Sequence, residues 1–178
     1  MLFRSDWDKA GTASGNWFHE STIGYSGQLI DTLKAATAPV PGGMVAGKKE
    51  YSWGHLSLVP HWVQPSVWLA SLGTWADPAG DFRQFALRPG PKRPDQLTPQ
   101  DGVVAYELVT WVHVNAQGQP VDGRSYPVGY QVQMSESVMG VLAVRVNANN
   151  TLTVEKRPDL KSAAAFTTFG SAAETYWH

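Results

Sequence analysis

The segment 103–114 constrains the fold most strongly, because its even-numbered and odd-numbered positions form two distinct sets of side chains over all twelve residues. Neighbouring side chains of a β-strand point to opposite faces of the sheet, so this alternation predicts a strand. Both sets are partly apolar, which indicates a long strand in a central or strongly curved position. One face carries Val104, Tyr106, Leu108, Thr110, Val112 and Val114, and the other carries Val103, Ala105, Glu107, Val109, Trp111 and His113.

A β-hairpin is predicted over residues 141–155. Its strands, 141–146 and 151–155, flank the four residues Asn-Ala-Asn-Asn at 147–150. Asparagine tolerates the left-handed backbone that a tight turn requires. The alternation predicts that Leu142, Val144, Val146, Leu152 and Val154 point inward and that Arg145, Thr151, Thr153 and Glu155 point outward.

The rest of the chain predicts more strands, joined by short turns. Strands are expected at residues 51–59, 66–75, 82–87, 126–134 and 174–177, with a Pro- and Gly-containing turn at 76–81. Residues 88–102 carry four prolines, which cannot donate to a sheet ladder, so this segment is predicted to be a long surface connection. Short helices are expected at residues 30–36 and 161–166.

Strands that follow one another through short connections favour a meander, and closure into a barrel removes exposed sheet edges. The sequence therefore predicts an all-β, mainly antiparallel single domain that closes as a barrel, or alternatively forms a sandwich, with at most one or two short helices. The run Gly15-Asn16-Trp17-Phe18 resembles the Gly-x-Trp at the first strand of lipocalin-type barrels. This short resemblance favours the barrel and assigns no family.

Length and composition suit one globular domain, since the chain has 178 residues, of which 43% are hydrophobic. We expect this domain to span residues 6–178. Residues 1–5, Met-Leu-Phe-Arg-Ser, match the translation of a common sequencing adapter. We therefore expect them to be non-native and the natural sequence to be truncated at this end; the alternative is that they form a genuine short N-terminus.

Charge and cysteine content exclude several classes of partner and chemistry. The net charge is −1, and the basic pairs at 48–49 and 92–93 are isolated, so nucleic acid is not an expected partner. The absence of cysteine excludes disulfides, thiolate metal sites and a cysteine nucleophile. No run reaches the roughly 18 apolar residues of a membrane helix, so no transmembrane segment is expected.

Three histidines are the weak candidates for catalysis. His55 and His61 bracket a predicted strand, and His113 stands near the end of another. A metal site needs two or three converging imidazoles, usually with a carboxylate, and the spacing of His55 and His61 matches no ligand motif. No Gly-x-Ser-x-Gly elbow and no phosphate-binding loop is present. We therefore expect neither a metal nor a cofactor.

Tryptophan is in excess, with eight in the chain. Four of them, Trp53, Trp62, Trp68 and Trp75, lie within a short span and are the candidate ligand-binding residues. They indicate either an aromatic site for a sugar or a small apolar molecule, or ordinary core packing. Trp62 and Trp75 stand beside turns and are the two expected to be partly exposed.

The leading functional hypothesis is a domain of a bacterial envelope or secreted protein that binds a small molecule or carbohydrate in an aromatic-lined site. Two alternatives stay open. One is a hydrolase or isomerase that uses a histidine and a carboxylate in a barrel mouth. The other is a structural or protein-interaction module.

Overall fold

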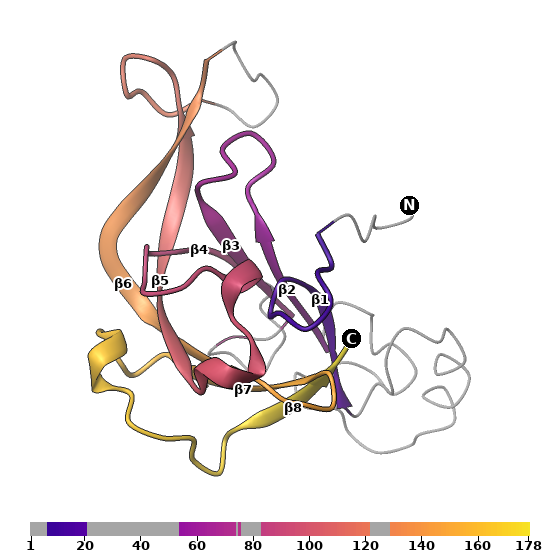
Figure 1. Ribbon diagram of the computed structural model, residues 1–178. Coiled ribbons are helices and arrows are strands. Elements are labelled where there is room, and N and C mark those ends of the chain that lie inside the picture. Colours follow the sequence, from indigo (N-terminus) through magenta and orange to yellow (C-terminus); the bar gives the residue numbers. More distant parts are fainter. Residues whose placement is uncertain (1–6, 21–53, 74, 76–82, 122–128) are drawn as a thin grey trace, which may run out of the picture.

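The computed structural model describes residues 7–20, 54–73, 75, 83–121 and 129–178 (Figure 1). Several predictions made above lie outside these residues: the pentapeptide 1–5, the helix at 30–36, Trp53 and the turn at 76–81. Within them, eight antiparallel strands close into a barrel in the order of the sequence. The predicted all-β barrel is thus confirmed, and the alternative sandwich is not formed.

The strands pair each with the next, and the last pairs with the first. Their bounds are β1 Gly15–His19, β2 His55–Pro60, β3 Trp68–Leu72, β4 Arg83–Leu87, β5 Val104–Val114, β6 Gln131–Val146, β7 Thr151–Arg157 and β8 Glu174–Trp177. Three 3-10 turns lie wholly within the described residues: η2 Pro94–Gln96, η3 Pro99–Asp101 and η4 Ala163–Ala165. The helix expected at 161–166 is therefore reduced to the single turn η4.

The barrel is closed unevenly. In the described residues, β5 and β6 pair through ten residue pairs, whereas β1 and β8 meet in only two, Phe18 with Trp177 and His19 with Tyr176. β5 and β6 also run well past the ends of β3 and β4 as a curved hairpin (Figure 1).

The curvature of this hairpin comes from irregular pairing. Leu108 pairs with Gly140, Val109 with Val138 and Trp111 with Met134, so β6 has more residues than β5 between successive pairs. Extra residues in one strand bend it and increase its twist. This corrects the prediction of two separate strands at 126–134 and 141–146. The bulges take up the polar residues between them, and one strand, β6, continues throughout.

The barrel interior is filled by alternate side chains, as the predicted strand pattern requires. Leu142, Val144, Val146, Leu152 and Val154 are all buried there, as expected. Thr151 and Glu155 were expected to face solvent but are buried. Hydrogen bonds compensate for their burial: Thr151 Oγ1 donates to Asn149 Oδ1, and Glu155 Oε2 accepts from the backbone N–H of Gly170 at 2.6 Å.

A second apolar cluster lies on the opposite face of β3, β4 and β5. Leu69, Ala86 and Val109 alternate with inward-facing neighbours, so they point out of the barrel. The curved end of β6 covers them with Val132, and Val67 completes the buried set. The long hairpin is thus packed against the outside of the barrel.

Candidate functional site

A pocket opens at one end of the barrel, where β3, β4 and β5 meet the connection that follows β4. Its volume is about 120 Å³. An engineered cavity of about 150 Å³ binds benzene, so this pocket has room for roughly one ring. The lining residues are Ser66, Trp68, Leu87, Arg88, Pro89, Gly90, Lys92, Arg93, Pro94 and Tyr106.

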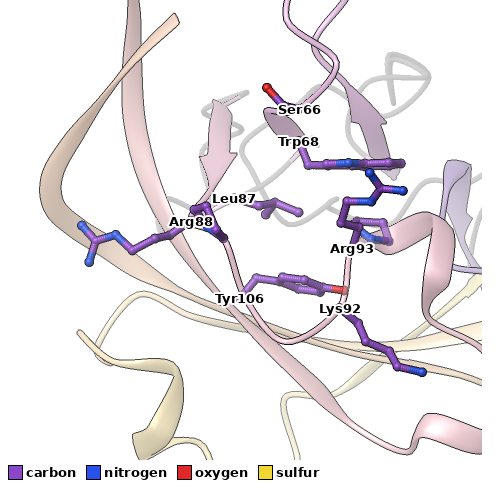
Figure 2. A pocket seen from close by; sticks show the side chains of 10 residues that line it. Ser66, Trp68, Leu87, Arg88, Lys92, Arg93 and Tyr106 are labelled. Carbon is purple, nitrogen blue, oxygen red and sulfur yellow. The ribbon is translucent and has the colours of Figure 1, made fainter.

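Strand register places the walls of the pocket. Trp68 pairs with Leu87 across β3 and β4, and Leu87 pairs with Leu108 across β4 and β5. Tyr106 lies two residues before Leu108 and therefore faces the same interior. Figure 2 shows the Trp68 indole and the Tyr106 ring on opposite sides of the pocket, with Leu87 between them at the back.

Both aromatic side chains carry a buried polar atom without a partner. Trp68 is 7% exposed and Tyr106 is 2% exposed. Neither the Trp68 indole N–H nor the Tyr106 hydroxyl has a hydrogen-bond partner among the described residues. A buried donor left without a partner costs about 1–3 kcal/mol, so two at one pocket need an explanation.

The Tyr106 hydroxyl stays protonated and can donate. Burial raises the pKa of this phenol well above its ordinary value, and the carboxylates of Asp101 and Asp95 raise it further. An indole N–H is a donor only. Two donors without partners among the described residues thus belong to side chains on opposite walls of the pocket.

Three cationic side chains stand at the rim, and each is already paired. Arg88 Nη1 donates to Glu107 at 2.9 Å and Arg93 Nη2 to Asp95 at 3.0 Å, while Lys92 pairs with Asp101. The hydrogen bond from Lys92, helped by those from Thr98, lowers the pKa of Asp101 to about 2. In Figure 2, Arg88 and Lys92 point away from the two rings, and Arg93 runs beside the indole. The rim charges are thus balanced locally.

Two of the three candidate histidines are brought together at another place. His61 follows β2 and His113 lies near the end of β5, and their Nε2 atoms are 3.0 Å apart. His61 is 1% exposed, and Trp111 packs edge-on against it with ring centroids 5.2 Å apart. His55 lies apart from this pair, buried at the start of β2, with its Nε2 3.1 Å from Asn16 Oδ1.

Among the described residues, the pair does not belong to a cluster that could hold a metal ion, and its hydrogen bonds decide where its protons lie. In the described residues, no cluster of three or more His, Cys, Asp or Glu side chains could hold a metal ion. The backbone N–H groups of Val63 and Gln64 both donate to His61 Nδ1 at 3.2 Å. These donors require a bare Nδ1, so the proton sits on Nε2, the nitrogen that points at His113.

The candidate tryptophans have different environments. Trp68 lines the pocket, whereas Trp62 is 67% exposed and stacks beside His61. Trp75 is partly buried and packs on Phe85 at the barrel core, with ring centroids 5.0 Å apart. Tyr106, the second aromatic wall, was not among the predicted site residues. Its inward position was readable from the alternation of 103–114, but its place at a pocket depends on a connection remote in sequence.

No protein-family model, no curated protein and no solved structure matches this chain. The fold and the pocket therefore define the molecule by themselves, as an eight-stranded antiparallel barrel with an aromatic pocket at one end. None of the helices in the described residues is long and apolar enough to cross a membrane.

Proposed function

We propose that this protein binds a small, uncharged ring that carries an acceptor oxygen, held between Trp68 and Tyr106. The observation that carries the proposal is the pair of buried donors without partners at one ring-sized pocket. A ligand oxygen that accepts from either donor would remove the cost of leaving it unpaired.

The shape and charge of the pocket support this class of ligand. A volume of about 120 Å³ is small for a drug-sized molecule or a fatty-acid chain, but suits one ring. Two aromatic walls favour a flat or apolar ring face. Among the described residues, no carboxylate lines the pocket and every rim cation has its own carboxylate, so an anionic ligand gains little over a neutral one.

The test is calorimetric titration with three probes of similar size: acetophenone, benzoate and toluene. Acetophenone presents a ring and a neutral acceptor, benzoate an anionic acceptor, and toluene no acceptor. We expect acetophenone to bind more tightly than toluene, and benzoate to bind no more tightly than acetophenone. Failure of all three to bind the wild-type protein would refute the proposal.

A pair of variants locates the site. Tyr106→Phe removes one donor and keeps the ring, so acetophenone affinity should fall by up to roughly tenfold while toluene affinity stays the same. Tyr176→Phe is the matched control, because Tyr176 is also buried in the core but its hydroxyl donates to Glu174 at 2.9 Å. Equal acetophenone affinities in the two variants would place the site elsewhere.

A further inference from the structure

The connection between β2 and β3 is fastened to the β5–β6 hairpin by two side chains. His61 Nε2 lies 3.0 Å from His113 Nε2, and Gln64 Oε1 accepts from the backbone N–H of Val132 at 2.8 Å. These contacts join segments that are far apart in sequence. They stand beside the outer apolar cluster, in which Val67 and Val132 are both buried.

The backbone of this connection fixes where the protons of the histidine pair reside. Because the N–H groups of Val63 and Gln64 both donate to His61 Nδ1, His61 must carry its proton on Nε2. That proton is donated to His113 Nε2, which must then be bare. Neutral His113 consequently carries its proton on Nδ1.

A further proton cannot be added without loss of a hydrogen bond. On His113 Nε2 it would set two N–H donors against each other across 3.0 Å. On His61 Nδ1 it would oppose the two backbone N–H groups that donate there. Transfer of the Nε2 proton from His61 to His113 does not solve this, because both nitrogens of His61 would then be deprotonated.

From this geometry we infer that the His61–His113 pair is an acid-sensitive clasp, which holds the β2–β3 connection on the β5–β6 hairpin when neutral and releases it when protonated. The inference goes beyond the proposed ligand binding and does not depend on it. Release of the connection would nevertheless affect the pocket, because Ser66 lies in this connection, Trp68 begins β3 directly after it, and both line the pocket.

The surroundings of the pair favour its neutral form. Trp111 packs against both rings, and Tyr130 packs edge-on against His113 with ring centroids 4.8 Å apart. Among the described residues, the titratable side chain in ring contact with the pair is Tyr130, beside His113. Burial lowers the pKa of both histidines, and the charge of His113 lowers that of His61 further.

The experiment is amide hydrogen exchange on the intact chain between pH 7.5 and 4.5, with rates corrected for the intrinsic effect of pH. We expect the protection of the Val63, Gln64 and Val132 amides to fall about tenfold or more as the pair takes up a proton. The amides of Val144 and Val154 in the barrel report global opening, which also depends on pH, and they should stay more protected than the three clasp amides at every pH. Equal protection of both sets would mean that the connection is released only when the barrel unfolds as a whole, and would overturn the inference.

Two variants separate the clasp from other histidines. In His61→Asn, the side-chain oxygen can accept from the same backbone N–H groups but does not titrate, so protection at Val63 and Gln64 should become independent of pH. His178→Gln is the control, and should retain the wild-type response. Unchanged pH dependence in His61→Asn would overturn the inference.

A direct measurement avoids substitution altogether. Nitrogen-15 spectra of the imidazoles at pH 7.5 should show a bare Nδ1 on His61 and a bare Nε2 on His113. The opposite tautomer on either ring would contradict the clasp.

Discussion

The indole of Trp75 occupies the space that a side chain at Gly140 would need. A Cβ atom built on Gly140 would lie 2.5 Å from Trp75 Cζ2 and 2.8 Å from the backbone oxygen of Arg157. Trp75 packs against the barrel core from the end of the β3 segment, and Gly140 pairs with Leu108 on β5. A glycine in the middle of the long strand β6 is therefore a packing requirement.

Gly140→Ala should lower the free energy of unfolding by about 1–3 kcal/mol, because the added methyl group meets both an aromatic ring and backbone. Urea unfolding followed by circular dichroism measures the change. Gly90→Ala is the matched control, since the nearest atoms to a Cβ there are 3.9 Å away. If both variants lose the same stability, the contact with Trp75 does not restrict residue 140.

Tyr106→Phe should leave the free energy of unfolding unchanged or slightly raised, because it deletes a buried hydroxyl without a partner in the described residues. Tyr176→Phe should instead cost about 1 kcal/mol, since it removes the hydrogen bond to Glu174. Urea unfolding of the two variants under the same conditions makes the comparison. A large loss in Tyr106→Phe would show that its hydroxyl has a structural partner.

Trp62→Ala should change neither stability nor acetophenone affinity appreciably, because this side chain is 67% exposed and does not line the pocket. Calorimetric titration of this variant beside Tyr106→Phe measures the difference. A weakened affinity in Trp62→Ala would move the binding site to the surface near the histidine pair.

The barrel should lose stability as the pH decreases below neutral, because His55 is buried in its neutral form. Burial lowers the pKa of His55 from 6.5 to about 4, so between these values the unfolded chain binds a proton that the folded protein does not. The free energy of unfolding therefore decreases as the pH falls from 6.5 to 4, by on the order of 3 kcal/mol, and is unaffected by this group above 6.5.

Urea unfolding at a series of pH values checks this window. His55→Gln cannot titrate, so its stability should depend less steeply on pH than that of the wild-type protein, while the contribution of His61 and His113 remains in both. Identical slopes would mean that His55 has the same pKa in the folded and unfolded chain.

The sequence predicted the barrel because alternation is a local property. Leu142 and Val154 could be placed in the core from their own neighbours alone. Burial of Glu155 could not be predicted in this way, because its partner Gly170 lies 15 residues away in the connection between β7 and β8. The continuity of β6 could not be predicted, because its polar central residues are typical of a turn. The pairs with β5 on either side of them, Val109 with Val138 and Trp111 with Met134, keep the strand continuous.

The site was less accessible to prediction. Tyr106 could be placed inward, but the lack of a partner for its hydroxyl is a property of everything around it. The histidine pair depends on a contact between residues 52 positions apart, which no spacing along the chain reveals. His55 and His61, the two that are close in sequence, have separate environments.

The uneven closure of the barrel determines where it can open most easily. Separation of β1 from β8 breaks only two residue pairs in the described part of the chain, whereas separation of β5 from β6 breaks ten. The junction of β4 and β5 also has two pairs, but Ala86 and Val109 there are buried in the outer apolar cluster. The meeting of the two terminal strands is thus a seam, and we expect thermal opening and mechanical rupture to begin there. Resistance of this protein to forced unfolding would then depend on the two pairs Phe18–Trp177 and His19–Tyr176. A covalent cross-link between β1 and β8 would lengthen the lifetime of the folded barrel.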